Sequence, residues 1–308
     1  MKDKLQKTCL RAPGLRAAAL LNAAIVSLAS AAAATAASTT LLQDSFDDGD
    51  RAGWFSASSN ASSCTLDNDA GTLTIGPERH IVTYFEATTL AIGDSLTVSF
   101  DVSFNNPKSY SNGIRMALYD SHSTAETSNR VAADGHGSGN DLFKPYTGYR
   151  ADMSFTAYTG TTNAIYIRHR NPADATHTGN SLLHSNTGMY YENIEGGGGS
   201  SATPTDAALY TGVFTITRLA TGTKILVSLV GTGLTNYSFE AEDTNGYSTF
   251  DTFAILLPTS NAMDTLTLHD VTITHAAAVP EPATAAAMLG VLTAALAAVI
   301  LTLRRRQR

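Results

Sequence analysis

Two carboxylates in this 308-residue chain have the spacing of a possible catalytic pair. A retaining glycosidase needs two carboxylates about 5 Å apart, one as acid and one as nucleophile. In the segment 240–243, Glu240 and Glu242 would lie on the same face of a strand, because side chains alternate along it. Asn245 and Gly246 follow at once and indicate a turn. We interpret the segment as the acidic end of a strand and assign no catalytic residue to the chain.

The second group with possible chemistry surrounds His169. Tyr166, His169 and Arg170 are close in the sequence and could neutralise a uronate and abstract a proton, as polysaccharide lyases do. Four further histidines fall in polar segments of the chain, namely His122, His136, His177 and His184. No pair of histidines has the His-x-His or His-x-x-x-His spacing typical of metal ligands. A lyase therefore stays one alternative function.

Binding of a sugar needs less than catalysis. A sugar ring stacks on an aromatic side chain, while its hydroxyls take hydrogen bonds from nearby polar groups. Several tyrosines lie among Asn, Asp and Arg residues and could form such a platform. The candidate ligand-binding residues are Tyr146, Tyr149, Tyr190, Tyr191, Arg168 and Arg170. Because tyrosines are common at strand ends in any sandwich, a protein without a ligand pocket is the other alternative.

The part of the chain that must position these residues has the pattern of strands. Over residues 96–104, apolar residues alternate with Thr, Ser and Asp, which is the period of a strand with one buried and one wet face. Further strands are predicted at 41–46, 72–75, 80–87, 113–119, 150–158, 164–168, 212–219, 224–230, 236–240, 252–257 and 265–274. Residues 220–223 form a predicted hairpin loop. The predicted fold class is all-β, a two-sheet antiparallel β-sandwich.

Residues 171–205 break this pattern. The segment is rich in Asn, Thr, His and Gly and contains the glycine run 196–199, whose backbone freedom makes a single conformation unfavourable. We expect a long surface excursion from one domain, because the strands after residue 205 are too few to close a second core.

Aspartates occur near both ends of the predicted sandwich. The segment 44–49 reads Asp-Ser-Phe-Asp-Asp-Gly, Gly53-Trp54 follows it, and the last strand contains His269-Asp270-Val271. These residues resemble the first and last strands of concanavalin A-like and carbohydrate-binding jelly rolls. The resemblance implies a jelly-roll fold in which Asp44, Asp47 and Asp270 bind a structural Ca2+, an ion that takes six to eight oxygen ligands. His269 departs from the family pattern, and turn-forming or solvated aspartates are the alternative. No cofactor is otherwise required.

The two ends of the chain have the composition of export signals. The leader is basic at Lys2, Lys4, Lys7, Arg11 and Arg16. An apolar run follows at 17–33, and Ala34-Thr35-Ala36 has the small-x-small pattern that signal peptidase reads. Near the C-terminus, residues 283–303 are apolar and uncharged, and at about 1.5 Å each they would span about 32 Å of bilayer as a helix. The arginines that follow predict a cytoplasmic C-terminus.

The C-terminal segment carries three elements in a fixed order. They are Val279, Pro280, Glu281 and Pro282, then the apolar run 283–303, then Arg304, Arg305 and Arg306 in the basic tail 304–308. This order resembles the PEP-CTERM sorting signal, over residues 279–308 only. The resemblance implies a Gram-negative bacterium that makes exopolysaccharide, a single-pass precursor in the inner membrane, and an exosortase-type membrane protease as partner. An ordinary single-pass anchor is the alternative.

The body between these signals, residues 38–278, is strongly acidic. It holds 11 basic and 25 acidic residues, so its net charge is −14. Such a surface repels nucleic acid and anionic membranes, whereas neutral glycans and divalent cations stay open as partners. Cys9 lies in the leader, so Cys64 is the one cysteine of the body and no internal disulfide is expected.

The predicted organisation is therefore a signal peptide at 1–37, a jelly-roll domain at 38–278 and a sorting signal at 279–308. We expect an exported, non-enzymatic protein of the cell surface or extracellular matrix that associates with exopolysaccharide or other glycans. A polysaccharide lyase or glycosidase on a jelly-roll fold, and a purely structural matrix component, are the alternatives.

Overall fold

A computed structural model describes most of the body of the chain. The described residues are 37–59, 64–67, 70–157, 162–172, 180–183, 191–198, 203–234, 237–244 and 246–279. Residues 37–278 form one compact unit. No helix within the described ranges is long and apolar enough to cross a membrane. The predicted apolar run 283–303 and nearly all of the predicted signal peptide lie outside these ranges.

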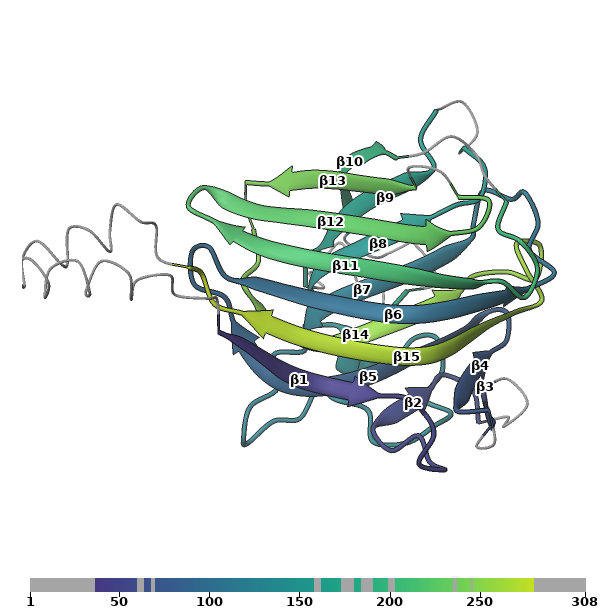
Figure 1. The fold of residues 1–308 in the computed structure, drawn as a ribbon. Helices are drawn as coiled ribbons and strands as arrows, with labels where there is room; N and C mark the ends of the chain where they lie inside the picture. The colour runs from purple at the N-terminus through teal and green to yellow at the C-terminus, as the bar shows by residue number, and fades with distance from the viewer. Residues whose placement is uncertain are drawn as a thin grey trace, which may run out of the picture. The chain divides into compact units, whose positions relative to one another are not determined.

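Two antiparallel sheets pack face to face (Figure 1). The first sheet has the order β13 (Ser238–Asp243), β12 (Gly222–Gly231), β11 (Leu209–Leu219), β6 (Ser95–Asn105), β15 (Thr265–Ala276), β4 (Thr72–Ile75) and β3 (Cys64–Asp67), and β1 (Ser38–Asp44) also pairs with β15. The second has the order β10 (Tyr191–Gly197), β9 (Ile165–Arg170), β8 (Thr147–Met153), β7 (Ile114–Asp120), β14 (Thr249–Leu257), β5 (Arg79–Thr89) and β2 (Trp54–Ser56). The prediction of an all-β, two-sheet antiparallel sandwich is confirmed.

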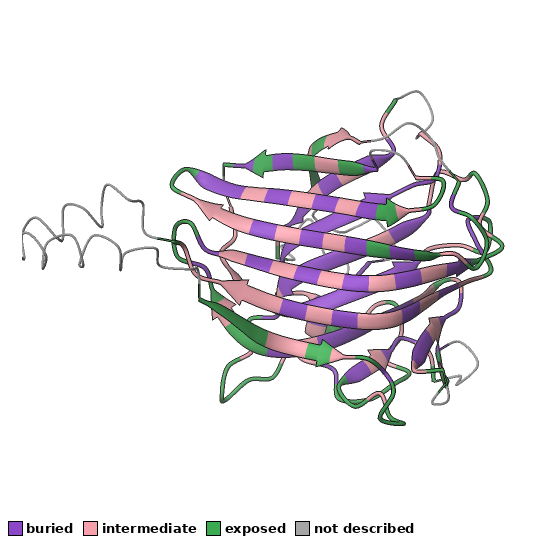
Figure 2. Ribbon diagram, viewed as in Figure 1, coloured by how far each residue is buried: buried purple, intermediate pink, exposed green. Residues whose placement is uncertain are grey.

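The core lies between the sheets and follows the alternation of the strands. Along β6, every second side chain from Leu96 to Phe104 is buried, and Figure 2 shows the same banding on β11, β12 and β15. Large aromatic rings fill the space, with Phe104 packed against Phe155 and Tyr210 at centroid distances of 5.5 and 5.4 Å. Trp54 is buried against Phe46, so it is a core residue. Burial of apolar area at about 25 cal/mol per Å² is the main stabilising term.

Strand ends follow the turn chemistry of the sequence. β11 and β12 pair from Tyr210 with Gly231 to Leu219 with Gly222, so the predicted hairpin loop shortens to Ala220 and Thr221. Gly222 has a φ of +149° and lies so close to the carbonyl oxygen of Asp243 that a Cβ there would collide with it. Glycine is therefore required at this position.

The outer face of the second sheet is covered over half its width. Residues 121–146, which include the short 3-10 helix η2 (Asp141–Phe143), and residues 182–183 lie over it. Their side chains complete a second hydrophobic cluster with β5, β7 and β14, formed by Val82, Ala117, Tyr119, Val131, Phe143, Tyr146, Leu182, Leu183, Ala254 and Leu256. Buried Asp251 of β14 anchors this cover, because it accepts hydrogen bonds from Ser121 N (2.8 Å) and Arg130 Nη2 (2.7 Å).

Both ends of the body leave the sandwich side by side. β1 pairs with β15 from Ser38 with Ala276 to Asp44 with Val271, and Ala277 N donates to the carbonyl oxygen of Ala37 at 3.0 Å. Asp94 holds the last residues in place. Its Oδ1 accepts from Ala278 N at 2.8 Å, and its Oδ2 lies 3.1 Å from His275 Nε2.

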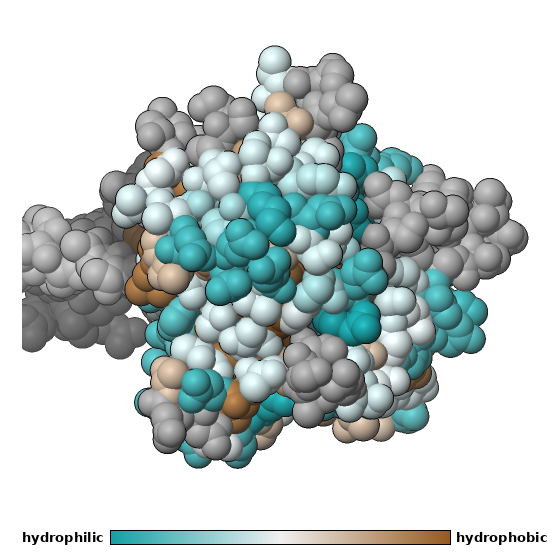
Figure 3. All heavy atoms as spheres, turned by 90° about the vertical axis from the view of Figure 1, so that its right-hand side faces the viewer, coloured by the Kyte–Doolittle hydropathy of each residue, from teal (hydrophilic) through white to brown (hydrophobic). Residues whose placement is uncertain are grey.

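Three strands were not predicted from the sequence. β2 and β3 are short, and β10 lies inside the segment 171–205, where we expected only an irregular surface excursion. β10 forms because its backbone pairs with the edge of β9, from Tyr191 with Arg170 to Gly197 with Ile165. Its polar residues and glycines show no alternation of apolar and polar side chains. The expectation of a surface excursion without a strand was therefore wrong for residues 191–197. Figure 3 shows that the described surface at the right-hand end of Figure 1 is mostly hydrophilic.

Candidate functional site

The outer face of the second sheet carries the most chemistry among the described residues. The register aligns its side chains in rows that cross β5, β14, β7, β8, β9 and β10. The middle row is Val82, Ala254, Ala117, Arg150, Arg168 and Asn193. Next to it on one side lie His80, Leu256, Arg115, Asp152, Tyr166 and Gly196, and on the other side Tyr84, Thr252, Tyr119, Gly148, Arg170 and Tyr191. In these rows, the four arginines and Asp152 lie on β7, β8 and β9, and none of them lies on β5 or β14.

Asp152 is the centre of the charged part. Its carboxylate lies 2.7 Å from Arg150 Nε, 2.8 Å from Arg168 Nε and 3.8 Å from Arg115 Nε. The Asp152 side chain is 3% exposed and that of Arg150 is 0% exposed. Burial alone would raise the pKa of Asp152, but Arg150, Arg115 and Arg168 outweigh it and hold the pKa below its usual value. Asp152 is therefore an anion and cannot serve as a general acid near neutral pH.

Arg170 is fully buried on the same face and has a different set of contacts. Its Nη1 and Nη2 donate to the carbonyl oxygens of Tyr146 and Phe143, which fastens the covering segment to β9. Its guanidinium also lies 5.8 Å from the ring centre of Tyr119 and 6.0 Å from that of Tyr191. Gly148 lies between Tyr119 and Arg170 in the row. Because glycine has no side chain, the Tyr119 and Arg170 side chains can approach each other over it.

We call this group the arginine patch, defined as Arg115, Arg150, Arg168, Arg170 and Asp152. Sequence reasoning selected Arg168 and Arg170 but missed the other three residues. The signal was present in the alternation of the segments 148–153 and 165–170. Apolar or aromatic residues stand at 149, 151, 153, 165 and 167, and the residues between them are mostly Arg, Asp and Tyr. The sequence does not give the register that brings Arg115, Arg150 and Arg168 together around Asp152, and the strand was predicted at 150–158, whereas β8 is Thr147–Met153.

The tyrosines selected as a sugar platform do not form one surface. Tyr146 is buried under the cover of the outer face, and its hydroxyl donates to the carbonyl oxygen of Asn129 at 2.8 Å. Tyr149 is buried on the inner face, where its hydroxyl donates to Asp243 Oδ2 at 3.1 Å. A ring with no exposed area cannot stack on a sugar. Tyr191 is partly exposed and contacts Arg150, with a distance of 4.0 Å from Arg150 Cζ to its ring centre, and Tyr190 lies outside the described residues.

The Tyr166, His169 and Arg170 set of the lyase alternative does not converge. Because side chains alternate along β9, His169 points to the face opposite Tyr166 and Arg170. His169 lies between Asp243 and Glu192, with Nδ1 3.2 Å from Asp243 Oδ2 and Nε2 3.1 Å from Glu192 Oε2. Glu240 and Glu242 are exposed on the outside of the first sheet with Ala241 buried between them, as a strand reading predicts.

Two of the three aspartates expected to bind Ca2+, Asp44 and Asp47, accept hydrogen bonds within the protein. Both oxygens of Asp44 accept hydrogen bonds, Oδ1 from Phe46 N at 2.8 Å and Oδ2 from Trp54 Nε1 at 2.7 Å. Asp47 Oδ1 accepts from Ser45 Oγ at 2.7 Å. Asp270 is the register partner of Asp101, and burial together with the charges of Asp101 and Asp47 raises the pKa of Asp270. Within the described residues, its Oδ1 is buried without a hydrogen-bond partner. In the described ranges, no group of three or more His, Cys, Asp or Glu residues is placed to hold a metal ion. The Ca2+ site therefore stays a prediction.

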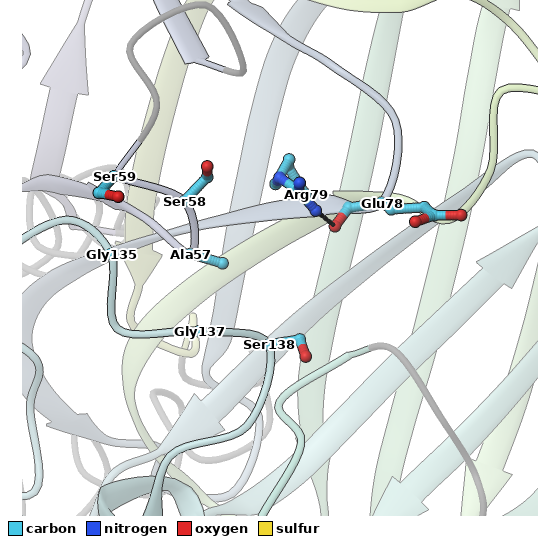
Figure 4. Close-up of a pocket in the computed structure, with 8 residues that line it drawn as sticks. All are labelled: Ala57, Ser58, Ser59, Glu78, Arg79, Gly135, Gly137 and Ser138. Atoms are coloured by element: carbon cyan, nitrogen blue, oxygen red, sulfur yellow. Dashed lines mark hydrogen bonds between the residues drawn. The ribbon is translucent and has the colours of Figure 1, made fainter.

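A polar pocket of about 410 Å³ opens at the start of β5. Figure 4 shows residues 57–59 and 78–79 along one side and residues 135–138 facing them. Three serines line it, Ser58, Ser59 and Ser138, together with Arg79 and Glu78. Arg79 Nη1 donates to the carbonyl oxygen of Glu78 at 2.8 Å, and the Glu78 carboxylate points away from the serines. Hydroxyls, a guanidinium and backbone groups suit the hydroxyl groups of a sugar.

Comparison with known proteins gives no sequence relative. No family model matches the chain, and no curated protein matches it. Solved structures match its fold at low similarity. An endo-1,3-beta-glucanase from Streptomyces sioyaensis is 15% identical with a TM-score of 0.40, covering 80% of this chain and 99% of that chain. Peanut lectin is 11% identical with a TM-score of 0.41, covering 79% and 98%. The exoplasmic/lumenal domain of VIP36 in metal-free form is 9% identical with a TM-score of 0.44, covering 76% and 90%.

Proposed function

We propose that this chain is an exported protein of the cell surface or extracellular matrix that binds polysaccharide without cleaving it. The observation that carries the proposal is the polar pocket at the start of β5. Its serine hydroxyls can donate hydrogen bonds to sugar hydroxyls and accept them, and Arg79 can donate to them. The signal peptide and the PEP-CTERM-like tail would deliver the body to the polysaccharide. Signal peptidase and an exosortase-type membrane protease are the partners that this route requires.

The pocket is tested by retention of the purified full chain on the producing organism's exopolysaccharide, with the length of the polysaccharide followed in parallel. We expect Arg79→Ala to weaken retention at least tenfold, because a hydrogen bond to a charged group contributes about 1.5–3 kcal/mol and about 1.4 kcal/mol corresponds to a factor of ten. Ser138→Leu, which fills the opposite side of the pocket, should act in the same direction.

Lys108→Ala is the matched control, because Lys108 is a surface cation outside the pocket, paired with Asp264. It should leave retention unchanged. Retention accompanied by shortening of the polysaccharide would replace the proposal with an enzyme. Absence of retention for the unaltered chain would leave a purely structural matrix role.

The sorting route makes a separate prediction. A chain that lacks residues 280–308 should be exported but recovered free of the membrane, while the full chain should pass through a membrane-bound precursor. Replacing Pro280, Glu281 and Pro282 with alanine should make that precursor accumulate, because the protease would no longer recognise its site. Cell fractionation with mass spectrometry of the C-terminus reads out both effects. Full-length, unprocessed chain free in the cytosol would refute the route.

A further inference from the structure

The arginine patch holds a large fraction of the basic residues of the body. The body has 11 basic residues in all, and four of them, Arg115, Arg150, Arg168 and Arg170, lie on the outward side of three neighbouring strands. Asp152 is the one carboxylate of the patch, so its net charge is +3 on a body whose net charge is −14. At physiological salt, charges more than about 8 Å away are largely screened, so a small ligand at this place meets mainly the local positive field.

Three of the four arginines make contacts that stabilise the fold. Arg150 is fully buried between Asp152 and the ring of Tyr191, and Arg170 is fully buried under the carbonyl groups that it holds. Arg115 donates from Nη1 to the carbonyl oxygen of Leu183 at 2.8 Å and so fastens the cover. These contacts account for the guanidinium groups of Arg150, Arg170 and Arg115 without a ligand.

Arg168 is placed differently. It lies on β9, next to the edge strand β10, and its side chain is 15% exposed, close to the 14% of Arg115. It reaches Asp152 through Nε at 2.8 Å, and within the described part of the chain its two terminal amino groups donate no hydrogen bond. The guanidinium fork suits two parallel hydrogen bonds to a carboxylate or a sulfate group, and Nε is occupied here, so the outer edge of the fork is the part that can receive an anion.

Tyr166 adds an aromatic face beside this cation. It is partly exposed, its ring lies over the backbone of Gly196, and Arg168 Cζ is 5.5 Å from its centre. Gly196 makes this placement possible, because a Cβ there would lie 2.5 Å from the Tyr166 ring. A cation next to a partly exposed ring matches a sugar that carries an anionic group, since the ring takes the apolar face and the guanidinium takes the charge.

We infer that the edge of the arginine patch, at Arg168 and Tyr166, binds an acidic sugar of a polysaccharide through its carboxylate or sulfate group. The inference rests on the proposed polysaccharide binding and adds to it a second contact surface with a defined ligand class. Nucleic acid fits less well. Duplex DNA carries one charge per about 1.7 Å along its axis, so the acidic surface around the patch repels it more strongly than a chain with one charge per sugar.

The test measures binding of the full chain, purified in a detergent without a sugar headgroup, to four probes. These are polygalacturonate, its methyl ester, dextran sulfate and dextran. We expect polygalacturonate or dextran sulfate to bind, and the uncharged partner of that probe to bind at least tenfold more weakly. Binding of polygalacturonate would identify a carboxylate as the anionic group, and binding of dextran sulfate would identify a sulfate. Arg168→Gln should weaken binding of the acidic probe at least tenfold, and Arg168→Lys should restore only part of it, because lysine lacks the planar fork.

Lys224→Gln is the matched control, because it removes the same charge from a partly exposed position on the other sheet, where Lys224 pairs with Glu240. It should change binding less than twofold. Tyr166→Ser provides a second variant that leaves every arginine in place, and it should weaken binding about threefold or more. Near-ultraviolet circular dichroism confirms that each variant is folded.

The inference is overturned if acidic and uncharged probes bind equally, or if Arg168→Gln and Lys224→Gln weaken binding equally. Those results would leave the proposed polysaccharide binding intact, provided that retention on the exopolysaccharide still depends on Arg79. The proposed function itself fails if Arg79→Ala leaves retention on the exopolysaccharide unchanged, so a separate variant tests it.

Discussion

Replacing Asp152 with asparagine is expected to lower the free energy of unfolding by about 3–5 kcal/mol, measured by urea unfolding at pH 7. The substitution keeps the shape of the side chain but removes the one negative charge shared by Arg150, Arg168 and Arg115. Three guanidinium groups would then lie close together with no carboxylate between them, and Arg150 has no access to solvent. Removing one partner of a buried ion pair is strongly destabilising for this reason.

The pH dependence of the same variant checks the cause. The pKa of Asp152 is depressed in the folded state, so its contribution to stability is complete above its unfolded pKa of about 3.9 and is lost as the pH falls through the folded value. The difference in stability between the unaltered chain and Asp152→Asn should therefore be constant above about pH 5 and shrink below about pH 4. A difference that stays the same at pH 3 would mean that the effect comes from packing and not from charge.

Replacing Asp251 with alanine is expected to lower the free energy of unfolding by about 3 kcal/mol. The Asp251 carboxylate is buried and accepts hydrogen bonds from Ser121 N, Ser121 Oγ and Arg130 Nη2 at 2.8, 2.5 and 2.7 Å. Its removal leaves the Ser121 amide buried without an acceptor and releases the start of the covering segment. Hydrogen exchange should rise most in residues 121–131.

Glu126→Ala is the control for that variant, since Glu126 is exposed in the same segment. It should change the free energy of unfolding by no more than about 0.5 kcal/mol. If Asp251→Ala costs less than about 1 kcal/mol, the hydrophobic cluster alone holds the cover in place, and the ion pair is incidental.

The sandwich could be predicted from local patterns because burial follows the period of two. The alternation at 96–104 is matched by β6, and the hairpin before Gly222 is matched by its two-residue turn. β10 could not be predicted in this way, because an edge strand made of Tyr, Glu, Asn, Ile and Gly depends on backbone pairing with β9 and not on its own side chains.

The site was harder to predict than the fold. Tyr146 and Tyr149 are only three residues apart, yet they lie on opposite sides of the second sheet, one under the cover and one in the core. Their accessibility depends on what packs over each face, which sequence composition does not encode. Asp152 gains its three arginine neighbours from β7, β8 and β9 together, so its environment depends on register across the sheet. Arg168 was a predicted candidate, but its position beside Asp152 follows only from that register.

The pairing of the last strand has a mechanical consequence. β15 is hydrogen-bonded to β6 along its length, and its other edge is bonded to β1 and β4. Antiparallel hydrogen bonds run perpendicular to the strands, so tension applied at residue 279 along β15 loads many of them in parallel and in shear. If the body is held at its C-terminus while it binds a polymer in flowing water, the force acts along β15, which is paired on both edges. Such a strand would resist mechanical unfolding better than an edge strand whose hydrogen bonds break one at a time.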